Sequence, residues 1–137
     1  MATLLHVFAH PSPDTSLTMR IARAFVECYR EAHPGDTVEE VDLYAIDMHH
    51  LTAVHLEAIM AAGDAARMSP AASDSWEEIA ATVGQLLQAD KLLLTSPMWN
   101  FGVPSIMKAY VDHVVLAGFT FSFTGPGSSV GLMRGRP

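Results

Sequence analysis

The fold is decided by the stretch LLLTSPMWNFGVP at residues 92–104, which joins a short apolar run to a helical segment. The run at 92–95 predicts a buried strand, and Ser105–Ala117 predicts a helix. A loop that leaves a strand and enters a helix lies at the carboxyl edge of an open α/β sheet, where such sheets bind ligands. The stretch therefore predicts a ligand-binding loop at residues 96–104.

The composition of this loop is unusual, because exposed loops are mostly polar. Apolar side chains stand here beside small polar residues: Met98, Trp99, Asn100, Phe101 and Gly102. Backbone amides between Trp99 and Gly102 are placed to donate to the edge of a heterocycle, while Met98 and Trp99 flank its face. A flat hydrophobic ligand accounts for this composition, and packing of the loop under a neighbouring element accounts for it as well. Gly102 and the following Val103-Pro104 are expected to set the turn.

The rest of the chain alternates strand-like and helix-like segments. Strands are predicted at Thr3–Ala9, Thr37–Leu43 and Asp90–Thr95, and helices from Ser16, over Ala53–Ala66, over Ser75–Gln88 and over Ser105–Ala117. This alternation indicates βαβ units and a parallel sheet, with the first strand between the other two. The loops after the first and third strands then border one crevice. Phe119–Phe123 predicts a strand or hairpin, and the Gly-, Pro- and Ser-rich Thr124–Pro137 predicts a loop.

Two helices carry further expectations. The first has one apolar face, which we expect to pack in the core: Leu17, Ile21, Ala24, Phe25 and Cys28. The helix over residues 75–88 is expected to begin at an Asp74 N-cap, since Glu77 would complete a capping box. Ser69-Pro70 is expected to break the chain before it.

Composition bounds the class of protein. A length of 137 residues, half of them hydrophobic, predicts one globular domain over 1–137. No apolar run approaches a membrane span, no secretory signal is recognisable, and the single Cys28 fits a reducing cytosol, so we expect a cytoplasmic protein. The net charge of −7 disfavours nucleic acid and anionic membranes as partners.

The loop after the first strand is the second candidate for ligand binding. It runs from His10 to a helix that starts near Ser16, and the free amides of a first helical turn bind phosphate. The alternative is that Asp14, Thr15 or Ser16 only caps the helix. Neither GxGxxG nor a Walker pattern is present, which argues against a dinucleotide-binding Rossmann domain and a P-loop NTPase.

The run PMWNFGVPSIMKAYVDHVVLAGFTFSF, residues 97–123, resembles the signature of the FMN-dependent NAD(P)H:quinone oxidoreductase and azoreductase family. Members read P-M/L-Y/W-N-F-G/S-x-P, then L-K-x-x-x-D, then G-x-T-F. More weakly, Ser16-Leu17-Thr18 at a helix start resembles the phosphate loop of that family.

The resemblance implies a flavodoxin-like α/β fold, a three-layer sandwich around a parallel sheet. It also implies a homodimer that binds FMN and transfers a hydride from NAD(P)H to the flavin, then two electrons to a quinone or azo compound. The residues matched by position fall in two groups. His10, Ser16, Leu17 and Thr18 would hold the phosphate, and Met98, Trp99, Asn100 and Phe101 would contact the isoalloxazine. No catalytic residue is assigned, because the hydride chemistry belongs to the flavin.

The resemblance also implies that the chain is truncated before the fourth strand of the family and its second flavin loop. The third predicted strand then becomes an apolar sheet edge, which is a template for pairing. A second copy, a rearranged Phe119–Phe123 segment or another protein are the candidates to cover it.

Two other functions stay open. One is an interaction protein that has lost flavin redox chemistry. The other is a cofactor-independent acid–base enzyme acting on an aromatic substrate through four groups: His10, Asp14, Tyr44, and His49 or His50. His49, His50 and His55 form a loose cluster, but HExxH and a set of cysteines are missing, so we expect loop histidines in solvent and no metal site.

Overall fold

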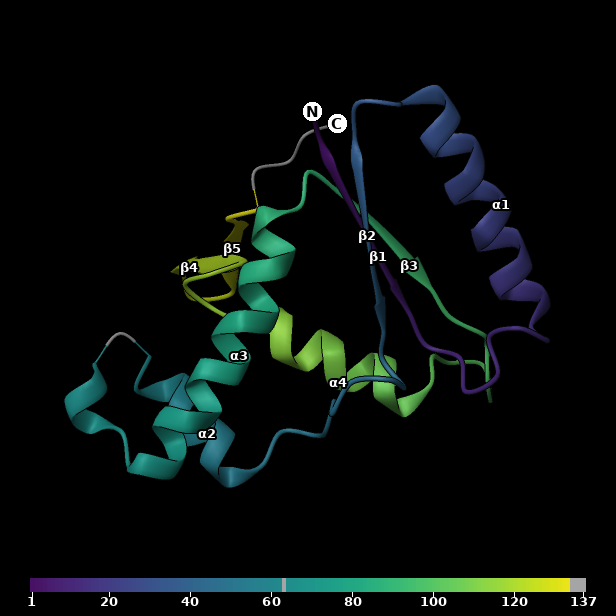
Figure 1. Ribbon diagram of the computed structural model, residues 1–137. Coiled ribbons are helices and arrows are strands. Elements are labelled where there is room, and N and C mark those ends of the chain that lie inside the picture. Colours follow the sequence, from purple (N-terminus) through teal and green to yellow (C-terminus); the bar gives the residue numbers. More distant parts are fainter. Residues whose placement is uncertain (63, 134–137) are drawn as a thin grey trace. The chain divides into compact units, whose positions relative to one another are not determined.

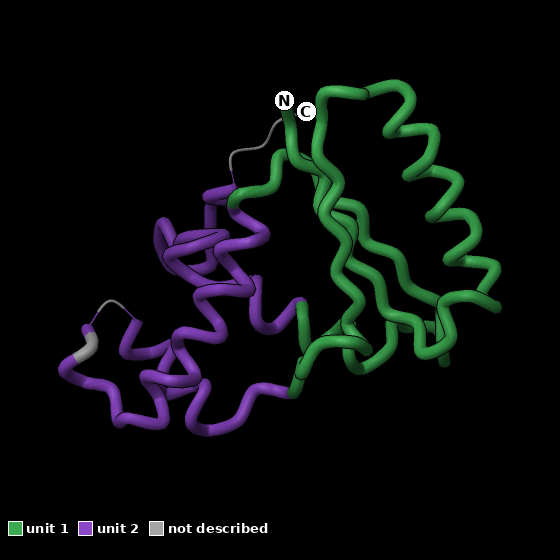
Figure 2. The backbone as a smooth tube through the Cα atoms, in the orientation of Figure 1, with its two compact units in different colours: residues 1–49, 88–110, 136 green, residues 50–87, 111–135, 137 purple. Residues whose placement is uncertain are grey.

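The computed structural model describes residues 1–62 and 64–133 (Figure 1). Its elements in chain order are β1 (Thr3–Phe8), α1 (Leu17–Ala32), β2 (Thr37–Asp42), α2 (Ala53–Met60), the 3₁₀ helix η1 (Ala65–Arg67), α3 (Pro70–Gln88), β3 (Lys91–Thr95), α4 (Ser105–Val114), β4 (Phe121–Gly125) and β5 (Ser128–Gly131). The described residues form two compact units (Figure 2). Unit 1 holds Met1–His49 and Gln88–Tyr110, and unit 2 holds the remainder. That the chain is one domain stays a prediction.

Unit 1 contains a three-stranded parallel sheet in the order β2-β1-β3, as the alternating pattern predicts. The central strand is apolar and buried, since Leu5 and Val7 have no exposed surface. Among the described strands, β3 lies at the edge of this sheet, and its Leu92 and Leu94 are 42% and 48% exposed. The expected apolar sheet edge is therefore confirmed.

Helix α1 turns a different face to the core from the one that its sequence predicts. The buried residues are Met19, Ala22 and Val26, on the opposite side of the helix from the predicted stripe. Leu17, Ile21 and Phe25 are exposed, and so is Cys28. Both faces are apolar, so periodicity alone does not choose between them, and the smaller side chains Ala22 and Val26 allow close packing. The expected core face is wrong.

The start of α3 also differs from expectation. The helix begins at Pro70, four residues before the predicted Asp74 cap, and Asp74 lies inside it. Ser69 takes the capping role, because its Oγ accepts from the Ala72 amide at 3.2 Å. Pro70 then occupies the first helical position, where its fixed φ suits the helix and its missing N–H costs nothing. The predicted break is the beginning of the helix.

Unit 2 has its own small core, formed by Ile79, Val83 and Leu116. Thr120 closes the end of α4, because its hydroxyl donates to the Val114 carbonyl at 3.0 Å and accepts from the Leu116 amide at 2.9 Å. Strands β4 and β5 form the expected hairpin, but β5 lies where a loop is predicted. The part of that prediction at 134–137 lies outside the described residues.

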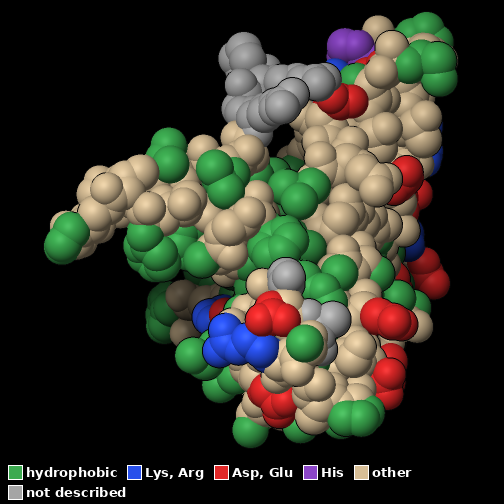
Figure 3. Space-filling view, turned by 90° about the vertical axis from the view of Figure 1, so that its left-hand side faces the viewer, with side chains coloured by type: hydrophobic (Ala, Val, Ile, Leu, Met, Phe, Trp, Pro, Cys, Tyr) green, Lys and Arg blue, Asp and Glu red, His purple; other side chains and the backbone are tan. Residues whose placement is uncertain are grey.

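The surface carries many apolar side chains. In unit 2 these include Leu56 and Met60 of α2 and Phe123 and Val130 of the hairpin. Figure 3 shows hydrophobic side chains gathered on the face that it presents. Within the described residues, every helix is too short or too polar to cross a bilayer. Exposed apolar surface of this kind is typical of contact sites.

Candidate functional site

The candidate site lies at the carboxyl ends of β1 and β3, where two loops begin inside unit 1 (Figure 1). The two strand ends are tied together, because the Ala9 amide donates to the Thr95 carbonyl at 3.0 Å. The loops also meet beyond the strands: the rings of His10 and Trp99 lie edge to face, with their centroids 6.3 Å apart. The predicted juxtaposition of the first and third loops is confirmed within unit 1.

The loop after β3 is a tight hairpin turn. The amide of Trp99 donates to the carbonyl of Gly102 and the amide of Gly102 to the carbonyl of Trp99, both at 2.9 Å. The two residues between them have positive φ, 50° at Asn100 and 62° at Phe101, which defines a type I′ turn. Asn tolerates this conformation, whereas a phenylalanine there costs about 1 kcal/mol. Gly102 takes part in the turn as expected, because its backbone closes the turn with Trp99, while the left-handed positions are Asn100 and Phe101.

The apolar side chains of this turn face solvent. Phe101 is 97% exposed, Met98 74% and Trp99 43%. None of the described elements therefore covers these side chains well enough to explain the apolar composition of the loop. Strained backbone that persists in a loop at a sheet edge indicates a functional constraint. What remains is a surface that presents aromatic and thioether groups on a strained turn.

The other end of the candidate site is the start of α1. Ser16 is the N-cap: it is buried, and its Oγ accepts from the Met19 amide at 3.3 Å. The capping alternative is therefore confirmed for Ser16. The amides of Leu17 and Thr18 precede the first intrahelical hydrogen bond and carry the positive end of the helix dipole. These amides, rather than the Ser16 side chain, are the groups suited to an anion.

Charges around this helix start are balanced. The Asp14 carboxylate would repel an anion, but Arg23 Nη2 donates to its Oδ1 at 2.8 Å. His10 Nδ1 accepts from the Ser12 amide at 3.0 Å, so a neutral His10 carries its hydrogen on Nε2. That N–H is available as a donor beside the loop. The site is thus suited to a ligand with an anionic end and a flat aromatic end.

The groups of the acid–base alternative have separate local roles. Asp14 pairs with Arg23, and His49 Nδ1 lies 3.1 Å from the carbonyl of Asp47. Tyr44 is 44% exposed and follows an Asp42 turn, while His50 belongs to unit 2. These contacts do not bring the groups together at one point, so they give the acid–base alternative no support.

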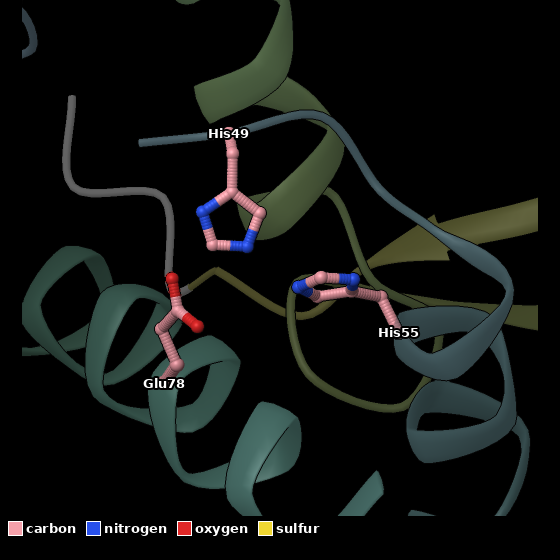
Figure 4. A group of neighbouring side chains, drawn as sticks. All are labelled: His49, His55 and Glu78. Atoms are coloured by element: carbon pink, nitrogen blue, oxygen red, sulfur yellow. The ribbon is translucent and has the colours of Figure 1, made fainter. Parts of the chain in front are cut away.

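One histidine of unit 2 differs from expectation. His55 is 5% exposed inside α2, where its Nδ1 accepts from the Thr52 amide at 3.1 Å as part of a capping box. The expectation of a solvated loop histidine is wrong at this position. Figure 4 shows His55 with Glu78 of α3, whose ligand atoms lie within 4.8 Å of each other.

The fold and the two-loop site define an α/β protein of the flavodoxin class, and comparison with known families agrees. The chain belongs to the family described as flavodoxin-like fold, whose model matches residues 2–137.

Individual relatives are similar over the same range. An FMN-dependent NADH:quinone oxidoreductase of Caldicellulosiruptor saccharolyticus is 37% identical over 138 residues, which cover 99% of this chain and 64% of the relative. A crystal structure of azoreductase from Bacillus anthracis is 30% identical with a TM-score of 0.90, covering 97% of this chain and 64% of that one. An FMN-dependent NADH-azoreductase from Bacillus anthracis, solved in complex with FMN, is 27% identical with a TM-score of 0.86 and the same coverage. The chain thus spans slightly less than two thirds of these proteins.

The sequence did not single out one residue of β1, the strand whose carboxyl end carries the first loop of the site. His6 lies in the middle of β1 with no exposed surface, and both of its ring nitrogens have side-chain partners. A single polar residue inside the apolar run TLLHVFA was the available signal.

Proposed function

We propose that the protein is an FMN-dependent oxidoreductase that uses NAD(P)H to reduce quinones or azo compounds by two-electron transfer. Family membership and the activities for which its relatives are named support this proposal. The observation that carries it is the exposed type I′ turn at Asn100-Phe101, next to His10 at the carboxyl edge of the sheet. A strained turn that presents aromatic groups suits the face of a flat heterocycle.

The residues of the two loops fit FMN by their chemistry. The Leu17 and Thr18 amides and the Nε2–H of His10 would bind the phosphate, with Ser16 holding the helix start in place. Met98 and Trp99 would lie against the ring system, and the Asn100 and Phe101 amides would donate to its polar edge. Bound FMN supplies the chemistry of accepting a hydride and passing on two electrons. The part of the protein is to bind, orient and shield.

The proposal includes a homodimer in the cytoplasm. Exposed apolar side chains on α1 and on β3 support self-association, because surface of this kind is stabilised by burial. One cysteine in 137 residues supports a reducing compartment. A sedimentation experiment on the purified chain tests the dimer, and a monomer at micromolar concentration would overturn it.

The test of the proposed activity is a titration of the purified full chain with FMN. We expect the flavin fluorescence to be quenched, the visible band to shift, and added NADH to be consumed when a quinone is present. Riboflavin, which lacks the phosphate, serves as the matched ligand control and should bind more weakly. A chain that folds but neither quenches FMN nor oxidises NADH would overturn the proposal.

A second candidate is an interaction protein without flavin chemistry, and the half-exposed β3 edge favours it. A sheet edge with Leu92 and Leu94 partly exposed is a template for a strand from a partner. A folded chain that binds no FMN but is isolated in a stoichiometric complex would support this candidate over the first.

A further inference from the structure

His6 occupies an unusual place, because it is a fully buried polar residue at the centre of a parallel sheet. Central strands of parallel sheets are normally apolar, and a buried imidazole costs free energy unless both nitrogens are satisfied. Here both are. Nδ1 lies 3.1 Å from Oε1 of Glu40 on β2, and Nε2 lies 2.9 Å from Oγ1 of Thr95 on β3.

The direction of these hydrogen bonds follows from the partners. A carboxylate only accepts, so Nδ1–H donates to Glu40. In the neutral imidazole Nε2 then accepts from the Thr95 hydroxyl. Glu40 continues the chain of contacts outward, since its Oε2 lies 3.4 Å from Nη2 of Arg30 on α1. One side chain therefore connects both neighbours of the central strand, and through Glu40 it also reaches the covering helix.

The contact with Thr95 matters because the sequence of β3 does not by itself fix the register of this strand against β1. Its centre is Leu92-Leu93-Leu94, three identical side chains that would fit β1 in more than one register. In the observed register Leu93 lies opposite His6 and Thr95 opposite Phe8. Thr95 is the only residue of β3 with a hydroxyl, and it reaches His6 in the observed register, so this hydrogen bond stabilises that alignment over those that place a leucine there.

The alignment of β3 decides where its loop lies. Thr95 is the last residue of β3, and the turn at Trp99–Gly102 begins four residues later. A slip of one residue would move that loop by about 3.3 Å relative to the loop after β1. The His10–Trp99 ring contact joins these loops and would not survive such a shift.

We propose that His6 is a positioning residue, which fixes the register of β3 through Thr95 and thereby holds the two loops at the spacing that a flavin requires. The identity of the ligand in this inference rests on the proposed function, whereas the effect of His6 on the register of β3 does not. His6 does not touch the ligand; it acts through Thr95.

The test compares variants of the full chain. Thr95→Val removes the hydroxyl with little change of shape, and we expect it to raise the dissociation constant of FMN about tenfold, as misplacement of binding groups does. His6→Leu should give the same loss. His6→Gln, which retains a polar atom near the position of Nε2, should recover most of the affinity.

The matched control is Tyr29→Phe, which removes a hydroxyl that donates to Asp36 at 2.6 Å at the other end of the same sheet. We expect it to lower the stability of the chain while leaving FMN affinity unchanged. Equal losses of affinity in the control and in Thr95→Val would show a general destabilisation and overturn the inference.

Hydrogen exchange without flavin makes the test independent of the proposed function. The hydrogen-bonded amides of Ala9, Trp99 and Gly102 should exchange about tenfold faster in Thr95→Val than in the parent and the Tyr29→Phe control. Unchanged exchange there would overturn the inference even if FMN binds. Faster exchange in a chain that binds no FMN would support the positioning role and reject the flavin function.

Discussion

The two ends of the sheet in unit 1 are built in opposite ways. At the amino end, charged and polar groups are closely paired: the Ala2 amide donates to Asp36 at 2.8 Å, Tyr29 donates to the same carboxylate, and Lys91 Nζ donates to the Tyr29 oxygen at 2.8 Å. At the carboxyl end, the loops carry a strained turn and exposed aromatic side chains. One end stabilises the fold, and the other holds groups ready for a ligand, so substitutions at the two ends should separate stability from binding.

The largest effect is expected from Trp99→Ala, which removes the principal aromatic surface of the candidate site. We expect FMN affinity to fall about thirtyfold, or about 2 kcal/mol, with a smaller change in the free energy of unfolding. The measurement is a fluorescence titration beside a urea melt. The control is Trp76→Phe in unit 2, where Trp76 packs on Phe119 at 5.3 Å between ring centroids, and its FMN affinity should match that of the parent.

The second effect concerns acid stability at the amino end. The hydrogen bond from Tyr29, followed by those from the Ala2 amide and Lys91, holds the pKa of Asp36 well below its ordinary value of 3.8. The ionised carboxylate is favoured in the folded chain, so its contribution is present above about pH 4 and is lost as the pH falls further.

Asp36→Asn should therefore lower the melting temperature at neutral pH and flatten its decline in acid. Thermal melts from pH 2.5 to 7 on the variant and the parent measure this difference. Parallel curves for the two proteins would mean that Asp36 does not carry the acid sensitivity. Affinity for FMN should stay unchanged in the variant, because Asp36 lies at the end away from the loops.

The third effect is a gain of stability at the carboxyl end. Phe101→Gly should raise the free energy of unfolding by up to about 1 kcal/mol, because glycine adopts a φ of 62° without strain and Phe101 has almost no packing to lose. The neighbouring Gly102→Ala should be close to neutral, since a Cβ there would meet only the Trp99 carbonyl oxygen at 3.8 Å. Loss of stability in Phe101→Gly would contradict the assignment of strain.

The smallest effect is expected from Tyr110→Phe. The Tyr110 hydroxyl is buried and has no hydrogen-bond partner among the described residues, and burial raises its pKa to about 12. Removing it should leave the free energy of unfolding unchanged or slightly higher, whereas Tyr29→Phe should cost about 1 kcal/mol. Urea melts of both variants compare a satisfied phenol with an unsatisfied one. A larger loss in Tyr110→Phe would reveal a partner for that hydroxyl.

The topology of the sheet and the pairing of its two loops follow from the sequence, because buried parallel strands are continuous apolar runs and their order follows from short right-handed crossovers. The packing of α1 does not follow, since Met19, Ala22 and Val26 form as good an apolar face as Leu17, Ile21 and Phe25. Residues of the candidate site were predicted by position, but their geometry was not. The positive φ of Phe101 arises from the closure between Trp99 and Gly102, which composition does not reveal.

The exposed apolar stripe of α1 allows an estimate of the free energy that covering it would contribute. Leu17, Ile21 and Phe25 are 66%, 66% and 51% exposed, so covering them completely would contribute about 1 kcal/mol each, or about 3 kcal/mol together. That amount changes a dissociation constant about 150-fold. A surface that covers this stripe would gain that factor in affinity, and three substitutions to polar residues would remove the gain.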